Sequence, residues 1–159
     1  MSEHGAPPAG PLLAACRELA RAMDGFHEAA CAALGLGRSD LRALNLLEHG
    51  PSTPSELARR LGLTRPAVTA LIDRLATSGY VTRTSVPRDR RASAVQLTDR
   101  TWHALARVYR PLGEQIQQVD GHLTDRERHT LVEGLAHLAA TFDGTRSLVA
   151  DRPDAGPGD

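Results

Sequence analysis

The sequence predicts a mainly α-helical protein with a small β-wing, arranged as a winged helix-turn-helix between long N- and C-terminal helices. Two observations support this fold class. Two short, capped helices joined by a glycine turn precede a β-hairpin at residues 81–97, whose tip is rich in arginine. Outside this stretch, apolar residues recur at helical spacing in residues 12–34 and 99–142. One domain is the expectation for a chain of 159 residues.

The N-terminal part of the chain is predicted to hold two helices. The first runs from Leu12 to about Leu34 with one apolar face, and Ser39 is expected to cap the second. Residues 1–11 are rich in Pro, Gly and Ala, so we expect a disordered N-terminus before the first helix.

The two central helices have clear start and stop signals. Thr53 and Glu56 form a capping box at the start of the first, and Gly62 is expected to end it in a left-handed conformation. Thr64 is expected to cap the second helix, and Gly79 to stop it before an extended strand. The two helices and the hairpin make residues 38–98 the predicted winged helix-turn-helix domain.

The C-terminal part is predicted to hold two more helices. Thr98 is expected to cap the first, and a second capping box at Thr124–Glu127 opens the last one. The terminal helices carry more apolar surface than one small winged domain needs, which predicts a homodimer formed by residues 12–37 and 99–145. The alternative is a monomer with additional core helices. Residues 146–159 are predicted to be a flexible tail.

The second central helix has an exposed face that suits the DNA major groove. Its N-terminal half carries short or hydrogen-bonding side chains, and the amides at a helix N-terminus attract phosphate. The alternative is an ordinary capped helix whose exposed residues are small. The predicted DNA-binding residues of the two central helices are Thr53, Thr64, Arg65, Pro66, Thr69 and Arg74.

The tip of the hairpin is the second predicted DNA contact. Arg88, Arg90 and Arg91 lie together there, and Asp89 offsets one of the three charges. Guanidiniums gathered in one turn repel each other without an anionic partner, and a phosphate backbone or a narrow minor groove supplies one. The alternative is a solvated basic turn.

The distribution of charge along the chain favours nucleic-acid binding, although the total net charge does not. The chain has 19 basic and 19 acidic residues, yet residues 59–91 hold eight arginines against two aspartates. That segment has a net charge of +6, whereas the segments before and after it are each at −3. A neutral protein with one basic segment is expected to have a defined binding face for a polyanion.

The chain closely resembles the MarR family of bacterial transcription regulators. The resemblance runs from about Leu12 to Phe142 and is strongest in LGLTRPAVTALIDRLATSGYVTR and RDRRASAVQLT. It implies a dimer with intertwined terminal helices, a recognition helix at Thr64–Arg74, and a wing that is braced by Asp89. One departure is the pair Arg100-Thr101, which stands where the family usually has Lys-Gly.

The resemblance also implies a small-molecule effector. Family members often respond to small aromatic or phenolic anions bound between the dimer helices and the winged domain. A guanidinium beside apolar walls suits a carboxylate or phenolate. The matching residues here are Arg21, Met23, His27, Arg38 and Arg42, although solvated helix arginines are the alternative for Arg21 and Arg38.

Other chemistry has less support in the sequence. His27 and Cys31 are one helical turn apart, a near miss of a zinc-binding pattern without an evident third ligand, so we expect no metal and no cofactor. Cys16 and Cys31 are expected to be free thiols, with oxidant sensing as the alternative to an inert buried role. No catalytic triad or Gly-rich phosphate loop is present, so no enzyme activity is predicted.

The sequence has neither a membrane-spanning apolar run nor a signal peptide, so a cytoplasmic protein without a membrane partner is expected. The predicted function is a sequence-specific, DNA-binding transcription regulator. We expect a ligand-responsive repressor that binds double-stranded DNA as a dimer at a pseudo-palindromic operator. The alternative is a winged-helix protein-interaction module without specific DNA binding.

Overall fold

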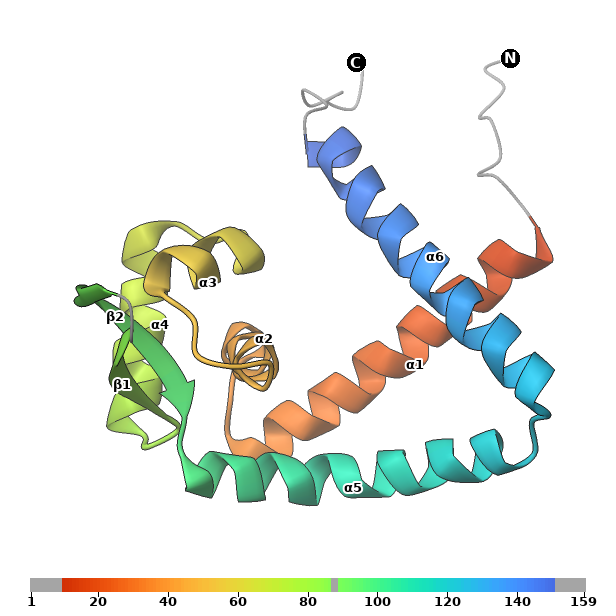
Figure 1. Cartoon of the computed structure of the whole chain (residues 1–159), viewed down its shortest axis with the longest axis horizontal. Coiled ribbons are helices and arrows are strands. Elements are labelled where there is room, and N and C mark those ends of the chain that lie inside the picture. The colour runs from red at the N-terminus through yellow and green to blue at the C-terminus, as the bar shows by residue number, and fades with distance from the viewer. Residues whose placement is uncertain (1–9, 87–88, 151–159) are drawn as a thin grey trace, which may run out of the picture. The chain divides into compact units, whose positions relative to one another are not determined.

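The computed structural model describes residues 10–86 and 89–150, and the side chains of residues 85–92 and 146–150 lie outside its description. The described chain is mainly helical with one two-stranded antiparallel sheet, as the sequence predicts (Figure 1). The elements are α1 (Pro11–Leu34), α2 (Arg38–Leu47), α3 (Pro54–Leu61), α4 (Arg65–Thr77), β1 (Val81–Val86), β2 (Asp89–Leu97), α5 (Asp99–Gly121) and α6 (Asp125–Ala150).

The chain divides into two compact units, and the boundary lies between Tyr109 and Arg110, inside α5. The first unit holds α1 to α4, the hairpin and the start of α5, and the second holds the rest of α5 and α6. These units do not follow the predicted boundaries at residues 37/38 and 98/99. The difference arises because Ala30 and Cys31 of α1 and Leu105 of α5 are buried in the core of the winged helix. The dimerising role of residues 12–37 and 99–145 stays a prediction.

The core of the first unit is aliphatic. Leu44, Leu57 and Val95 have no exposed surface, and they come from α2, α3 and β2 respectively. Replacing a buried leucine of this kind by alanine typically lowers the free energy of unfolding by about 2–5 kcal/mol. The core therefore holds α3 and α4 against the hairpin, which positions the two central helices.

The central helices begin and end where the sequence predicts. The Thr53 hydroxyl accepts the Glu56 N–H at 3.3 Å, and Glu56 Oε2 accepts the Thr53 N–H at 2.8 Å, which is a reciprocal capping box. Gly62 has φ 69°, a left-handed conformation that favours glycine, and it ends α3. Thr64 caps α4 by accepting the Ala67 N–H at 3.4 Å.

The start of α2 differs from the prediction. Ser39 does not cap this helix, because the helix begins at Arg38 and Gly37 is its N-cap residue. The side chain at the end of the first turn takes that role instead: Asp40 Oδ2 accepts the Gly37 N–H at 3.2 Å. A glycine N-cap has no side chain to offer, so an acid three residues later supplies the acceptor.

The hairpin pairs Val81 with Leu97 and continues in register to Ser85 and Ser93. A single bridge adds Ser52 to this sheet, since the Ser52 N–H donates to Val95 O at 3.0 Å and the Val95 N–H donates to Ser52 O at 2.9 Å. The bridge ties the connection between α2 and α3 to the wing. It was not predicted, because one extended residue leaves no alternating pattern in the sequence.

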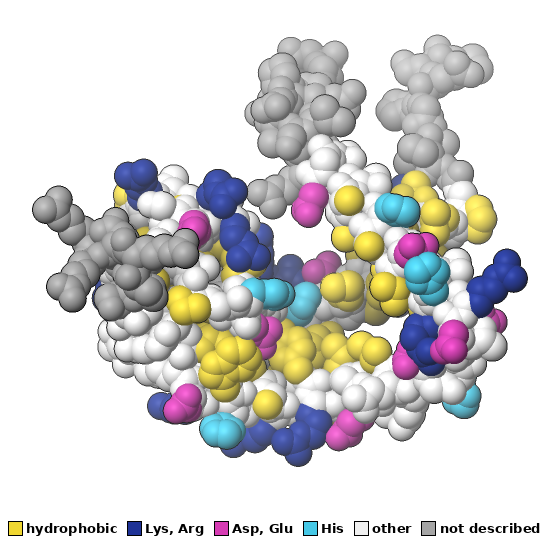
Figure 2. Space-filling view, viewed as in Figure 1, with side chains coloured by type: hydrophobic (Ala, Val, Ile, Leu, Met, Phe, Trp, Pro, Cys, Tyr) yellow, Lys and Arg dark blue, Asp and Glu magenta, His cyan; other side chains and the backbone are white. Residues whose placement is uncertain are grey.

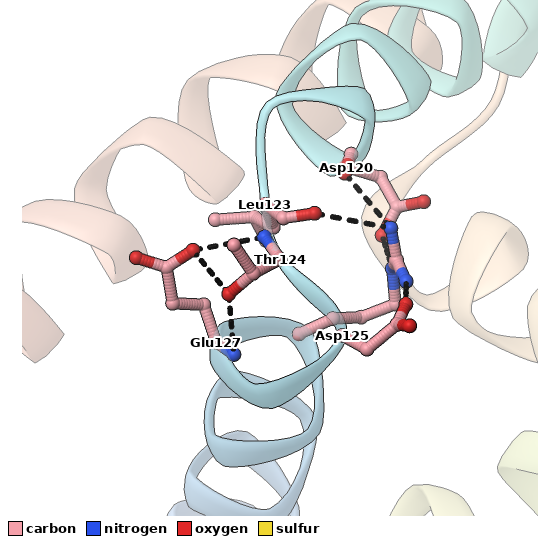
Figure 3. A network of polar contacts seen from close by, with 6 residues as sticks. Asp120, Leu123, Thr124, Asp125 and Glu127 are labelled. Atoms are coloured by element: carbon pink, nitrogen blue, oxygen red, sulfur yellow. Dashed lines mark hydrogen bonds and ion pairs between the residues drawn. The ribbon is translucent and has the colours of Figure 1, made fainter.

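In the second unit, the turn between α5 and α6 is a network of polar contacts (Figure 3). The predicted capping box is confirmed: Thr124 Oγ1 accepts the Glu127 N–H at 3.3 Å, and the Thr124 N–H donates to Glu127 Oε2 at 2.8 Å. The Arg128 guanidinium donates to Asp120 at 2.7 Å and to Asp125 at 2.6 Å, and it also reaches the carbonyl oxygens of Asp120 and Leu123. Arg128 thereby satisfies one terminal carbonyl of α5, that of Asp120, and one carbonyl of the turn, that of Leu123.

The predicted ends of the chain lie partly outside the described residues. α1 begins at Pro11, within the predicted N-terminal segment 1–11, and residues 1–9 are not described. α6 extends to Ala150, so residues 146–150 are helical and not part of a flexible tail. Residues 151–159 of the predicted tail lie outside the description.

Candidate nucleic-acid interface

Helix α4 has one buried face and one exposed face, and the exposed face holds the predicted reading residues. Val68, Leu71, Ile72 and Leu75 are buried. Thr64, Arg65, Pro66 and Thr69 are all exposed. The N-terminal half of α4 therefore presents short side chains and one long cation to solvent, which lets a helix approach base edges closely.

Thr69 makes a hydrogen bond within α4. Its hydroxyl donates to the Arg65 carbonyl oxygen at 3.1 Å, so the hydroxyl oxygen is left with lone pairs facing outward. In this rotamer Thr69 suits a base that donates a hydrogen bond, such as the amino group of adenine or cytosine in the major groove. Rotation of the hydroxyl would reverse that preference.

The two arginines predicted on α4 point in different directions. Arg65 and Arg74 are nine residues apart, which at about 100° per residue separates them by half a turn. Arg74 Nη2 donates to Asp40 Oδ1 of α2 at 2.5 Å, and this charged hydrogen bond raises the pKa of the guanidinium. The sequence placed both arginines on one reading face, whereas the structure engages Arg74 with α2. Contact of Arg74 with DNA stays a prediction.

Thr53 is the N-cap residue of α3, and its side chain is hydrogen-bonded there. Its hydroxyl donates to Glu56 Oε2 at 2.9 Å and accepts the Glu56 N–H. The backbone N–H of Thr53, followed by its hydroxyl, holds the pKa of Glu56 below its usual range. A DNA phosphate near Thr53 would therefore meet a hydroxyl that already makes two hydrogen bonds with Glu56, and the contact of Thr53 with DNA stays a prediction.

The predicted wing contacts lie largely outside the described residues. Residue Arg88 is not described, and the side chains of Asp89, Arg90 and Arg91 are not described either, although the backbone of β2 begins at Asp89. Nearer the base of the wing, Arg83 of β1 donates to Asp73 of α4 at 2.9 Å. This exposed ion pair joins the wing to the recognition helix and was not predicted.

Further arginines extend the basic face beyond the predicted set. Arg59 and Arg60 lie in the last turn of α3 and are exposed, as is Arg65. Figure 2 shows arginine side chains gathered over α3, in the upper left of the view. Their positive charges suit a phosphate backbone that crosses the first helix of a helix-turn-helix. The run Arg59-Arg60 just before Gly62 was the sequence signal for this basic surface.

The predicted effector residues divide between a pocket and the solvent. A pocket of about 370 Å³ lies between α1 and α2. It includes three predicted residues, His27, Arg38 and Arg42. The other lining residues, which were not predicted, are Asp24, Cys31, Ser39, Leu41 and Asn45. Arg38 Nη2 donates to Asp24 Oδ1 at 2.8 Å across the two helices.

Arg21 and Met23 do not line this pocket, so their prediction as ligand contacts is not supported there. Arg21 pairs with Glu18 one turn back on α1, and this contact raises the pKa of Arg21 and lowers that of Glu18. Met23 is half-exposed. The family resemblance supplied these two residues, and their contact with an effector stays a prediction.

The two cysteines are free thiols, Cys16 half-buried and Cys31 buried. Within the part of the chain that the structure describes, no three His, Cys, Asp or Glu side chains gather in a way that could hold a metal ion. In the same part of the chain, no helix is both long and apolar enough to cross a membrane.

Comparison with known proteins identifies the family. Residues 34–92 match the family model described as MarR family. The chain is 39% identical over 103 residues to the uncharacterized HTH-type transcriptional regulator YcgE of Bacillus subtilis, covering 64% of this chain and 67% of that protein. The chain belongs to the MarR family. It is therefore a DNA-binding transcription regulator and not an enzyme, which confirms the predicted function class.

Solved structures agree with this fold. A transcriptional regulator from Thermotoga maritima superimposes with a TM-score of 0.61 at 25% identity, covering 86% of this chain and 97% of that chain. A mutant of S. aureus MepR bound to an oligodeoxyribonucleotide superimposes with a TM-score of 0.56 at 17% identity, covering 84% of this chain and 99% of that chain. These likenesses confirm the winged helix arrangement of this MarR-family chain.

Proposed function

We propose that this MarR-family regulator is a repressor that binds a pseudo-palindromic operator as a homodimer and is released by a small aromatic or phenolic anion. The observation that carries the proposal is the exposed N-terminal half of α4 with Thr64, Arg65 and Thr69, which follows the exposed arginines of α3 in the chain. A base-reading helix next to a basic phosphate-binding surface is the arrangement that sequence-specific binding requires.

Support for the homodimer comes from exposed apolar side chains on the terminal helices. Ile116 and Val119 of α5 and Phe142 of α6 are each 58% exposed, and Leu12 of α1 is 63% exposed. Large apolar side chains at repeated helical positions are stable in water when a second copy of the surface covers them. Two copies related by a two-fold axis would present two recognition helices to half-sites about 34 Å apart.

Support for the effector comes from the pocket between α1 and α2. Arg38, Arg42 and His27 line it together with the apolar Leu41 and Cys31. A volume of about 370 Å³ is in the range of small-ligand sites. Asp24 and Arg38 offset each other's charge, and the guanidinium of Arg42 adds a positive charge to the lining that suits an anion. Its DNA target gives this regulator a cytoplasmic site of action.

The experiment that tests the proposal is selection of genomic DNA fragments by the purified protein. The retained fragments should share an inverted repeat whose half-sites are one helical turn apart, and salicylate should release them. Fragments with a single unrepeated site would contradict the dimeric operator. Retention that is unchanged by salicylate and by benzoate would contradict the aromatic-anion effector while leaving DNA binding intact.

A further inference from the structure

Asp40 of α2 is a buried carboxylate, and it has no role in the DNA contacts described above. It is 7% exposed, although it lies in the first turn of a helix where acids are usually solvated. Its two oxygens have separate partners: one accepts the Gly37 N–H at 3.2 Å, and the other accepts from Arg74 at 2.5 Å. A buried carboxylate is stable only when it is paired in this way, because desolvation of an unpaired charge is expensive.

The partner of Asp40 lies on the recognition helix, 34 residues away in the sequence. Arg74 is in the last turns of α4, and its side chain is 57% exposed, whereas that of Asp40 is 9% exposed. The pair therefore joins the capped start of α2 to the C-terminal part of α4. It adds a polar contact to the apolar packing of α4, at a point far from the reading residues.

The side chain of Arg74 points away from the reading residues of α4 and toward α2. Arg65, half a turn away, stands on the other edge of the exposed face of α4. When Arg65 reaches toward base edges, Arg74 reaches toward α2, where Asp40 accepts its hydrogen bond. The two guanidiniums therefore leave α4 on opposite edges of its exposed face.

We propose that Asp40 is a positioning residue for DNA recognition, which holds the recognition helix in its reading orientation through Arg74. Arg74 then acts as a tether and not as a contact to base or phosphate. The inference rests on the DNA binding of this family member and adds one residue, Asp40, to its machinery. It also reassigns Arg74 from the reading surface to the support of that surface.

The two roles of Arg74 predict opposite effects for one substitution. Asp40→Asn keeps an oxygen that can accept the Gly37 N–H, but it removes the charge that holds Arg74. If Asp40 positions α4, operator affinity falls by about tenfold, because the C-terminal part of the helix loses its polar contact with α2. If Arg74 contacts DNA directly, the same substitution frees a guanidinium and removes a negative charge near phosphate, so affinity stays constant or rises.

The experiment compares the wild type with Asp40→Asn, Arg74→Gln and the double variant, using full-length protein and an operator fragment that the wild type retains. Affinity is measured by fluorescence anisotropy at several salt concentrations. We expect each single variant to bind about tenfold more weakly, and the double variant to bind no more weakly than either. The slope of log affinity against log salt should stay unchanged in all of them, because no phosphate contact is lost.

Asp99→Asn is the matched control. It removes the same charge from an exposed position in the first turn of α5, within the same unit, and it should change affinity by less than about twofold. An Asp40→Asn protein that binds as tightly as the wild type overturns the proposal. A salt slope that is shallower by about 0.9 in Arg74→Gln does so too, since that change is the signature of a lost phosphate contact.

Hydrogen–deuterium exchange without DNA gives a second, independent readout. If Asp40 holds α4, the amides of α4 exchange faster in Asp40→Asn, while those of α3 keep their wild-type rates. Equal exchange of α4 in the two proteins overturns the tether. Should Asp40→Asn fail to fold, Arg74→Gln supplies both the exchange measurement and the salt slope. A wild type that selects no operator contradicts the proposed function, and the tether is then decided by exchange alone.

Discussion

Asn45 of α2 and Tyr109 of α5 share two hydrogen bonds: the Asn45 amide donates to the phenol oxygen at 3.1 Å, and the phenol donates back to Asn45 Oδ1 at 3.3 Å. The Tyr109 ring also packs edge-on against Phe26 of α1, with 5.2 Å between centroids. Three helices therefore meet at one tyrosine. Since Asn45 lines the pocket between α1 and α2, the same contact supports the candidate effector site.

Replacing Tyr109 by Phe should separate these contributions. The ring contact with Phe26 is kept, but the Asn45 side chain loses both of its hydrogen bonds to the Tyr109 hydroxyl in a partly buried position. We expect the free energy of unfolding to fall by about 1 kcal/mol, as is typical when one side-chain hydrogen-bond partner is removed. Urea unfolding followed by circular dichroism measures the change. A loss several times larger would mean that the ring itself moves.

The pocket residues predict a selective loss of effector response. Arg42→Gln removes a guanidinium from the lining, so salicylate should have to be about tenfold more concentrated to release the operator. Arg21→Gln removes a guanidinium outside the lining, where Glu18 is its partner, and should leave the salicylate response as it is. The ratio of operator affinities with and without salicylate is the measurement. Equal responses in the two variants would count against the pocket as the effector site.

Acid should weaken the two capping boxes. Hydrogen bonds from Thr53 lower the pKa of Glu56, and hydrogen bonds from Thr124 lower the pKa of Glu127. A lowered carboxyl pKa adds stability above the ordinary Glu value of 4.5, and this stability is lost as the pH falls through the lowered value. The unfolding midpoint should therefore drop below that pH. In a Glu56→Gln, Glu127→Gln double variant the drop should be smaller, and an unchanged acid profile would refute the assignment.

The wing and the recognition helix should differ in what their arginines control. Arg91→Ala is expected to weaken binding to every DNA sequence and to make the salt slope shallower by about 0.9, because a phosphate or minor-groove contact is lost. Arg65→Ala should mainly change which bases are preferred. Binding of random and operator fragments at fixed salt measures both. Arg126→Ala on α6, an exposed arginine in the second unit, is the control.

Much of this architecture is predictable because its determinants are local. The capping boxes at Thr53 and Thr124 each need only residues three positions apart, and the glycine at residue 62 needs only its own φ. The hairpin alternation is local as well. These features place every element in the correct order, and together with the basic segment they indicate a DNA-binding winged helix.

Contacts between residues that are far apart in the sequence could not be predicted from local patterns. The pairing of Asp40 with Arg74 depends on how α2 and α4 pack, and the bridge from Ser52 to Val95 depends on where the α2–α3 connection meets the sheet. The buried face of α4 follows from its apolar spacing, but the partner of an arginine on either edge of the exposed face does not, since both edges have the same local pattern. The predicted reading set therefore joined Arg65 with Arg74.

Dimerisation should depend on the apolar side chains that α6 leaves exposed. Phe142 is 58% exposed and Leu135 is 45% exposed on a helix whose polar positions carry several charges. A Phe142→Glu, Leu135→Glu double variant would bury two unpaired carboxylates if a second copy covers this face, so it should be monomeric at micromolar concentration. Arg126→Glu, also on α6 but at an exposed charged position, is the matched control and should keep the wild-type mass. Analytical ultracentrifugation distinguishes the two, and a double variant that remains a dimer would place the interface elsewhere.

The same variant should bind an isolated half-site about as well as the wild type, because α4 lies in the other compact unit. Its affinity for the full inverted repeat should fall by at least tenfold, since two linked recognition helices gain from their joint attachment.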